Sequence, residues 1–376
     1  MATKRRWTAG AVVVALATAI AGCTGTGTSP SVAPSAPAAS ASAAAATASA
    51  IPSQAAGKAP IAGRTQPVPN TSGKHLKIGL VSFPESNEFF SAVKVGSDAS
   101  TEVLKGFDTT VDYITVNEFT QDAVNAAARA AALQGYDALA FLPLDPGACP
   151  LIKELTGKGI KVAVFITTAD CAQTSGALFF HGEDLDKAWG EIATQALIKA
   201  VNDDPQWAGK QCKVGIITGA FSVPTHETMR KAIIRGLEGS NLTPVSDGVE
   251  IAQDLSKVGP AVKAYITGNP TDLCAVAVDI GDAGAAAAAL TDEQAKHIKV
   301  ISADFTVGGV EQMRKGKQTI LIGQDPFGEA YDTALLLYNT LVTGQDPGFY
   351  QPVKNSVMTP DNIDSLMEAQ ANGTAP

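Results

Sequence analysis

Several side chains in this sequence have the chemistry needed to hold a small polar molecule, and the first group follows an apolar run at residues 77–82. This group contains Asn87, Phe89 and Phe90. Amides pair with hydroxyl groups, and aromatic faces pack against the C–H faces of a sugar ring. A helix cap followed by two core aromatics would produce the same pattern, so this group alone fits either role.

Further polar residues follow other apolar runs. They are Asp145, Thr167, Asp279, Asp304 and Gln324. A single aspartate in such a position usually caps a helix or forms a turn. Several of them, combined with paired rings, indicate one shared site, because carboxylates accept strong hydrogen bonds from hydroxyl donors.

The sequence offers little for catalysis. It contains four histidines, and none has the spacing of a catalytic triad or of metal ligands. No glycine-rich phosphate loop follows the first apolar run, so we expect no cofactor and no metal. The remaining catalytic hypothesis is a carbohydrate-active enzyme in which Asp145 and Asp304 act as acid and base.

The elements that must position these residues alternate between short apolar runs, typical of strands covered on both faces, and longer amphipathic ones. We predict strands at residues 77–82, 111–116, 138–142, 161–166, 177–180, 213–218, 245–251, 275–279, 298–303 and 319–323. We predict helices at residues 89–105, 122–134, 185–201, 225–239 and 327–342. Gly135 and Gly239 are the predicted stop signals of two of these helices.

This alternation predicts an α/β fold class with two doubly wound, Rossmann-like lobes built on parallel sheets. Half of the strand–helix units precede His181, and the other half run from Lys213 to Gly323. Ligands of open α/β sheets bind beyond the carboxyl ends of the strands. The polar residues that follow the strands should therefore meet in a cleft between the lobes.

The N-terminus predicts export. Three basic residues at positions 4–6 precede an apolar run at residues 9–21, which fits a signal peptide and is shorter than the about 20 residues of a membrane span. The sequence Ile20-Ala21-Gly22-Cys23 resembles a bacterial lipobox. The resemblance implies that the mature chain begins at a lipidated Cys23 and is anchored to the outer face of the cell membrane.

Composition sets the predicted domain boundaries. Residues 24–73 consist mostly of Ala, Ser, Thr, Pro and Gly, which bury too little apolar surface to fold. We predict a signal peptide at 1–22, a disordered linker at 23–75, a first lobe at 76–181 plus about 325–350, and a second lobe at 182–324 plus about 351–376. The formal net charge of −9 argues against nucleic acid as a partner.

The folded region resembles the type I periplasmic binding proteins, especially those that bind ribose and xylose. The similar segments are Lys77-Ile78-Gly79-Leu80-Val81, Asn87-Glu88-Phe89-Phe90, Gln134-Gly135-Tyr136-Asp137-Ala138-Leu139, Leu142-Pro143-Leu144-Asp145, Lys158-Gly159-Ile160-Lys161-Val162, Asp279-Ile280-Gly281-Asp282-Ala283-Gly284 and Ile301-Ser302-Ala303-Asp304. They extend in order over residues 76–364. The resemblance implies two lobes that are joined by three crossings and close on a ligand like a hinged clamp.

The resemblance also implies ligand contacts. The first lobe would use Asn87, Phe89, Phe90 and, as a weaker contact, Asp145, while the second lobe or the hinge would use Asp279, Asp304 and Gln324. An arginine of the family corresponds to Arg230 or Lys231.

The sequence departs from the family at two of these positions. An Asp-Arg pair that grips sugar hydroxyls corresponds to Ile166-Thr167, and an aromatic residue that closes the pocket corresponds to Leu255. Threonine is not a conservative replacement for an arginine that binds hydroxyls, so the ligand can differ from ribose. Asp170 or Glu85 could substitute for the missing polar groups.

Five cysteines are present, and lipidation of Cys23 would leave four. An even number in an exported protein indicates disulfides, and four cysteines allow three pairings. The topology implied by the resemblance places Cys149 and Cys171 after neighbouring strands, and Cys212 and Cys274 before neighbouring strands. It therefore implies the pairs Cys149–Cys171 and Cys212–Cys274, one in each lobe.

These features predict an extracytoplasmic solute-binding lipoprotein, monomeric and without enzymatic activity. We expect it to capture a sugar or polyol by lobe closure and to deliver it to an ABC permease, with the lipid anchor as its only membrane contact. A sensor that presents its closed form to a receptor or kinase would use the same fold and pocket, and it stays open as an alternative.

Overall fold

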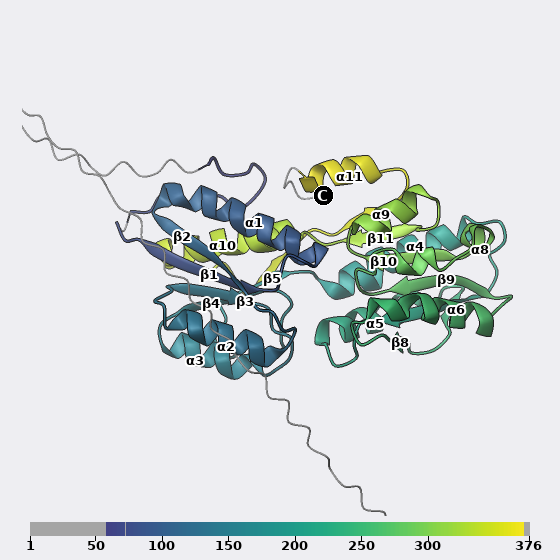
Figure 1. The fold of residues 1–376 in the computed structure, drawn as a ribbon, viewed down its shortest axis with the longest axis horizontal. Coiled ribbons are helices and arrows are strands. Elements are labelled where there is room, and N and C mark those ends of the chain that lie inside the picture. Colours follow the sequence, from purple (N-terminus) through teal and green to yellow (C-terminus); the bar gives the residue numbers. More distant parts are fainter. Residues whose placement is uncertain (1–57, 72, 372–376) are drawn as a thin grey trace, which may run out of the picture. The chain divides into compact units, whose positions relative to one another are not determined.

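Two sheets flanked by helices form the folded part of the chain (Figure 1). The computed structural model describes residues 58–71 and 73–371. The predicted signal peptide, Cys23 and the linker as far as residue 57 lie outside the described residues. Within the described part, no helix combines the length and the apolar character that a bilayer span needs.

The first sheet is entirely parallel and has the strand order β12-β5-β4-β3-β1-β2. Its strands are β1 (Leu76–Ser82), β2 (Thr109–Thr115), β3 (Ala138–Phe141), β4 (Lys161–Ile166), β5 (Phe180–Gly182) and β12 (Tyr350–Pro352). The helices that accompany it are α1 (Glu88–Leu104), the 3₁₀ turn η1 (Lys105–Phe107), α2 (Gln121–Ala132), α3 (Ala148–Gly157) and α10 (Pro326–Thr343).

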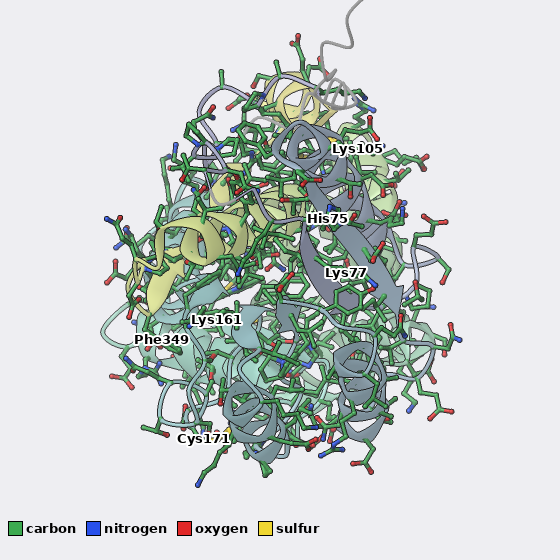
Figure 2. All side chains as sticks on the ribbon, turned by 90° about the vertical axis from the view of Figure 1, so that its left-hand side faces the viewer. His75, Lys77, Lys105, Lys161, Cys171 and Phe349 are labelled. Carbon is green, nitrogen blue, oxygen red and sulfur yellow. A yellow bond between two sulfur atoms is a disulfide. The ribbon has the colours of Figure 1, made fainter. Side chains whose placement is uncertain are left out.

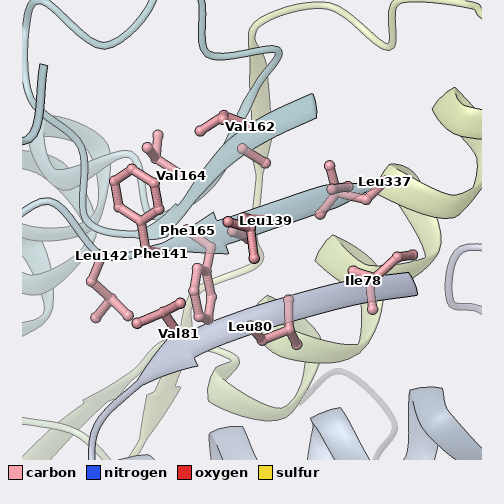
Figure 3. Packing of buried hydrophobic residues seen from close by; sticks show 14 of the residues in the cluster. Ile78, Leu80, Val81, Leu139, Phe141, Leu142, Val162, Val164, Phe165 and Leu337 are labelled. Carbon is pink, nitrogen blue, oxygen red and sulfur yellow. The ribbon is translucent and has the colours of Figure 1, made fainter. Parts of the chain in front are cut away.

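The core of the first lobe lies between this sheet and its helices. Side chains of β1, β3 and β4 lie close to Leu337 of α10 in Figure 3, and Ile78, Leu139 and Phe165 are among those without solvent exposure. Because both faces of the sheet are covered, its central strands are apolar at nearly every position. This burial explains why continuous apolar runs predicted these strands.

The second sheet has the strand order β13-β11-β10-β9-β6-β7, with β8 also paired to β6. Its strands are β6 (Cys212–Thr218), β7 (Leu242–Pro244), β8 (Val249–Glu250), β9 (Leu273–Val278), β10 (Lys299–Ala303), β11 (Ile320–Gly323) and β13 (Ser356–Met358). Only β13 runs antiparallel to its neighbour, β11. The predicted class of two doubly wound lobes with parallel sheets is thus confirmed, with β13 as the one antiparallel strand of the described sheets.

The helices of the second lobe include one irregular segment. They are the π-helical η2 (Asp186–Ala193), α4 (Thr194–Asn202), α5 (Pro224–Leu237), the 3₁₀ turn η3 (Leu255–Lys257), α6 (Val258–Gly268), α7 (Ala285–Ala288), α8 (Asp292–His297), α9 (Val307–Arg314) and α11 (Ile363–Ala371). The single helix predicted at residues 185–201 therefore begins in π form. Gly135 and Gly239 have φ of +76° and +77°, as expected for the predicted stop signals.

The chain passes between the sheets three times. It leaves the first sheet after β5, returns from β11 to α10, and passes from β12 to β13. A hydrogen bond links the first and third crossings: the Asn355 side chain donates to Glu183. These three crossings correspond to the hinge that the resemblance implies.

One predicted strand is wrong over most of its length. Residues 245–251 were expected to form a single strand, but only β8 lies in this range, and the chain also pairs with β6 just before it, at β7. Gly248, with φ of +117°, lies between the two pieces and cannot continue an extended strand. Strands β12 and β13 lack a long apolar run and were not predicted.

The predicted linker ends earlier than residue 75. Residues 61–68 lie along α10, where Ile61 N–H donates to the Tyr331 hydroxyl at 3.1 Å and Tyr338 donates to the Val68 carbonyl at 2.7 Å. Arg64 forms ion pairs with Asp325 and Asp332. We call residues 58–70 the strap. Specific polar contacts fix it, which its low apolar content could not indicate.

Candidate functional site

A cleft of about 490 Å³ lies where the carboxyl ends of the two sheets face each other. Residues that follow strands of both lobes line it, as the strand-end rule for open α/β sheets predicts. Of the ten residues predicted to contact a ligand, the seven that line this cleft are Asn87, Phe89, Phe90, Thr167, Asp279, Asp304 and Gln324.

The aromatic residues at the start of α1 form one cluster. The ring centroid of Phe90 lies 5.2 Å from that of Phe89 and 5.1 Å from that of Phe83. Phe119, which follows β2, adds a ring 4.5 Å from Phe83. Asn87 caps α1, because its Oδ1 accepts the N–H of Phe89 at 2.9 Å. Asn87 thus caps a helix and also lines the cleft, so the two roles are compatible.

The end of β4 contributes an apolar residue in an unusual conformation. Ile166 has φ of +66°, and the N–H of Thr167 donates to the carbonyl of Phe165 at 2.7 Å across it. The Thr167 hydroxyl donates to the carbonyl of Pro143 at 2.6 Å. Neither Asp170 nor Glu85 is among the lining residues, so neither supplies the missing polar group to this cleft.

Asp279 supplies a buried carboxyl group from the end of β9. Its Oδ1 accepts the N–H of Gly219 at 3.0 Å, and the residue is only 1 % exposed. Burial raises the pKa of Asp279 to about 7, although Thr218, Gly219 and the charge of Arg230 favour the ionised form. Near neutral pH, this carboxyl can therefore both donate and accept a hydrogen bond.

Asp304 and Gln324 form a second polar pair at the ends of β10 and β11. Gln324 Nε2 donates to Asp304 Oδ1 at 3.1 Å. Burial raises the pKa of Asp304 to about 6, while this hydrogen bond favours its ionised form. Asp304 has φ of +64°, a left-handed conformation that Asp tolerates better than most residues.

Six polar lining residues were not among the predicted contacts, namely Ser86, Glu88, Thr225, His226, Gln253 and Thr306, and two of them form a pair. His226 lies in α5 after β6, and Gln253 follows β8; Gln253 Nε2 and His226 Nδ1 are 3.2 Å apart. Burial lowers the pKa of His226 to about 4, so the imidazole is neutral at pH 7. The strand-end rule applies to both residues and could have found them.

Three predicted contacts do not line the cleft. Asp145 forms a local turn, in which its Oδ1 accepts the N–H of Gly147 at 2.6 Å. Arg230 donates to both carboxylate oxygens of Glu227 at 2.8 Å and lies 5.3 Å from the centroid of the Phe221 ring. Lys231 is mostly exposed and pairs with Glu227.

The cysteines pair as predicted, away from the cleft. Cys149 bonds to Cys171 with a Cα–Cα distance of 6.0 Å, and Cys212 bonds to Cys274 with a Cα–Cα distance of 5.8 Å. Cys171 lies near the outer edge of the view in Figure 2. Among the residues with described positions, no cluster of three or more His, Cys, Asp or Glu side chains could hold a metal ion.

The chain matches one family model over most of its folded part. Residues 78–346 match the family described as periplasmic binding protein domain. No curated protein sequence is significantly similar to the chain.

Solved structures share this fold at low sequence identity. A galactofuranose binding protein is 19 % identical, with a TM-score of 0.69 over 79 % of this chain and 99 % of the other. A periplasmic ribose ABC transporter protein from Conexibacter woesei is 18 % identical, with a TM-score of 0.69 over 80 % and 98 %. A carbohydrate transporter solute binding protein from Agrobacterium radiobacter, in complex with D-arabinose, is 17 % identical, with a TM-score of 0.68 over 79 % and 99 %.

Proposed function

Because this chain belongs to the periplasmic binding protein family, we propose that it captures a sugar or polyol outside the membrane and delivers it to an ABC importer. The observation that carries this proposal is the cleft, which combines aromatic rings from one lobe with carboxyl and amide groups from the other. Rings suit the C–H faces of a sugar, and carboxyl and amide groups suit its hydroxyls. The galactofuranose and D-arabinose named for similar structures belong to the same ligand class.

The ionisable side chains that line the cleft support an uncharged ligand. Among the described lining residues there is no Lys or Arg, so an anion would lack a counter-charge. His226 is neutral at pH 7, and the raised pKa of Asp279, about 7, leaves its carboxyl group partly protonated there. Groups of this kind donate to and accept from hydroxyls without requiring a charged partner.

Binding would act through the two lobes together. Ligand favours closure only if it contacts both walls, because it shifts an equilibrium by its differential affinity for the two states. The N–H of Val307 already donates to Glu88 Oε2 at 2.8 Å, which joins the lobes at the rim of the cleft. A closed form with ligand between both walls is then the species that a permease would recognise.

We further propose that the protein acts as a monomeric lipoprotein whose Cys23 carries the anchor. The basic residues, the apolar run and the Ala-Gly-Cys sequence of the N-terminus support this location. In this role the protein binds its ligand and does not convert it. Loss of uptake of the identified sugar on deletion of the gene would separate transport from sensing.

A thermal-shift screen against pentoses, hexoses, polyols and nucleosides tests the proposal. A ligand at 100 times its Kd stabilises the native state by about 2.7 kcal/mol, which raises Tm by several degrees. We expect such a rise for at least one sugar or polyol. A shift with nucleosides alone, or with none of these compounds, would contradict the proposed ligand class.

Replacement of Asp304 tests the site itself. Asp304→Asn keeps a side chain that tolerates φ of +64° but weakens acceptance from a hydroxyl, so we expect the Kd to rise about 10- to 100-fold. Asp108→Asn is the matched control, since Asp108 has φ of +53° and does not line the cleft. An unchanged Kd in Asp304→Asn, measured by calorimetry, would remove Asp304 from the site.

A further inference from the structure

The first lobe forms one wall of the cleft, and the interior of this wall is apolar. Phe90, Leu142, Leu144 and Ile166 line it, and each is at most 8 % exposed. Phe119 extends this surface to the mouth of the cleft, where it is 47 % exposed. A ligand that enters the cleft therefore meets aliphatic and aromatic carbon on this side.

In the interior of this wall, the polar side chain of Thr167 is already engaged. The hydroxyl of Thr167 donates its hydrogen to the Pro143 carbonyl. Asn87 Oδ1 accepts the N–H of Phe89, and Glu88 Oε2 accepts the N–H of Val307. Ser86, Asn87 and Glu88 are exposed, so they lie at the rim. Among the described residues, the interior of the first-lobe wall thus retains no free side-chain donor.

The second-lobe wall is mixed: it includes apolar residues such as Met229 and Ile280, but it also carries most of the buried polar groups of the cleft. Asp279, Asp304 and Gln324 meet there with His226 and Gln253, and all five line the cleft. Asp279 is nearly inaccessible to water, and its Oδ2 has no hydrogen-bond partner among the described residues, so this atom is best satisfied by a bound group. Hydrogen bonding to a ligand is therefore concentrated on one wall.

Ile166 adds an independent observation. A β-branched residue rarely adopts φ of +66°, and an Asn or Gly would adopt it with less strain. Strained residues of this kind cluster at ligand clamps and persist where the surroundings fix them. The strained side chain lines the cleft and supplies apolar surface there, which indicates that an apolar group at this position serves binding.

We propose that the ligand is amphipathic. It is a neutral polyhydroxylated ring whose hydroxyls face the second-lobe wall and whose apolar substituent packs on the first-lobe wall around Ile166. A deoxy methyl group, or the alkyl or aryl group of a glycoside, is the substituent that fits. This inference rests on the proposed function and narrows its ligand class.

Calorimetric titration of the native protein with matched pairs tests the inference. The pairs are D-galactose with D-fucose, L-mannose with L-rhamnose, and D-glucose with its methyl and phenyl β-glucosides. One added apolar group in an apolar pocket changes affinity about 10- to 200-fold, so we expect at least a 10-fold lower Kd for the substituted member of one pair. Equal or tighter binding of the free sugar in every pair overturns this inference alone. Binding of none of these compounds also overturns the inference, and the proposed function fails with it only if no pentose or polyol raises Tm in the thermal-shift screen.

Replacement of Ile166 locates the substituent. Ile166→Asn relieves the backbone strain and adds a polar group, so we expect the affinity ratio within the selective pair to fall about 10-fold. Ala252→Asn is the matched control, because Ala252 has φ of +52°, is exposed and does not line the cleft. Leu144→Ala removes apolar surface from the same wall without adding a polar group and should also lower the ratio. An unchanged ratio in both cleft variants, with melting curves that show folded protein, overturns the assignment.

Discussion

The carboxyl groups of Asp279 and Asp304 lie at the ends of neighbouring strands, β9 and β10, where burial raises their pKa values to about 7 and about 6. The cleft therefore carries less negative charge at neutral pH than its composition implies. A carboxyl group that retains its proton can donate to a sugar oxygen, and an ionised one can accept from a hydroxyl. At the scale of single residues, environment as well as residue type determines the chemistry of this site.

Glu183, at the first crossing, gives the protein a pH-dependent stability. Burial and, to a lesser extent, the charge of Asp304 raise its pKa to about 8, although the hydrogen bond from Asn355 favours the ionised form. The unfolded chain has the ordinary carboxyl pKa of about 4.3. The folded protein therefore binds the extra proton between these values, and the free energy of unfolding falls as pH rises from about 5 to about 8.

Glu183→Gln removes this contribution. We expect the variant to gain stability relative to the native protein as pH rises from 5 to 8, by roughly 2 kcal/mol or more, because each pKa unit is worth about 1.4 kcal/mol. Urea unfolding at both pH values measures the difference, and the exposed Glu368→Gln serves as the control. A stability difference that is the same at pH 5 and pH 8 would contradict the assigned protonation. Burial also raises the pKa of Glu329, which is present in both the native protein and the variant.

At this scale, part of the site was readable in the sequence. Asp279, Asp304 and Gln324 directly follow apolar runs, so strand-end position was enough to find them. Arg230 lies inside α5, where a shift of one residue turns a side chain by about 100°, and the sequence could not fix the helix register. The conformation of Ile166 depends on a turn that no residue type in the sequence predicts.

At the scale of elements, a close approach of α1 to α10 holds the first lobe together. A Cβ atom on Gly96 would lie 2.1 Å from the carbonyl oxygen of Phe327. That oxygen belongs to the backbone of α10, so it cannot move without shifting the helix. Gly96 is therefore required by helix packing, although its φ is that of an ordinary helical residue.

Gly96→Ala tests this packing. We expect a loss of about 1–3 kcal/mol in the free energy of unfolding, because overpacking forces backbone shifts. Gly157→Ala in α3 is the control, since nothing lies within 4 Å of its added Cβ and a helical alanine should be neutral or stabilising by up to about 1 kcal/mol. Equal effects of the two substitutions, measured by urea unfolding, would refute the close approach.

The strap is a second element that tertiary contacts fix. The Arg64 side chain is 4 % exposed and pairs with Asp325, which caps α10 immediately after the second crossing. Its guanidinium also lies 5.2 Å from the centroid of the Phe327 ring. The strap thus braces the segment through which the chain returns from the second lobe.

Removal of the Arg64 side chain should be costly. We expect Arg64→Ala to lower the free energy of unfolding by about 3 kcal/mol, because it leaves buried carboxylates without their counter-charge. Arg129→Ala removes an exposed ion pair with Glu154 and should cost less than about 1 kcal/mol. A loss below 1 kcal/mol for both variants in thermal unfolding would show that the strap does not brace the lobe.

Elements with long apolar or amphipathic patterns were predicted within a few residues, as β1 and α10 illustrate. Helices α3 and α6 were not predicted, although both are local elements. Other exceptions depend on distant partners. Strand β12 has three residues and forms because its backbone pairs with β5. The paired residues His181 and Gln351 are 170 positions apart in the sequence. The strap has the composition of a linker, yet α10 supplies acceptors and rings that hold it.

At the scale of the whole molecule, the topology brings distant residues to one place. Asn87 and Gln324 are far apart in sequence, but two parallel sheets and three crossings put both in the same cleft. The repeated strand–helix pattern was sufficient to predict the two lobes. It could not predict the shape or polarity of each wall, because these depend on which side chains face inward at each strand end.

The structure of the complex with the sugar selected by thermal shift, determined by crystallography, tests the central claim most directly. We predict that one sugar lies in the cleft, with hydroxyls within hydrogen-bond distance of Asp279 and Asp304 and with carbon atoms packed on Phe90 and Ile166. A sugar bound elsewhere on the surface, or held by only one of the two walls, would contradict the proposal that both lobes bind one ligand.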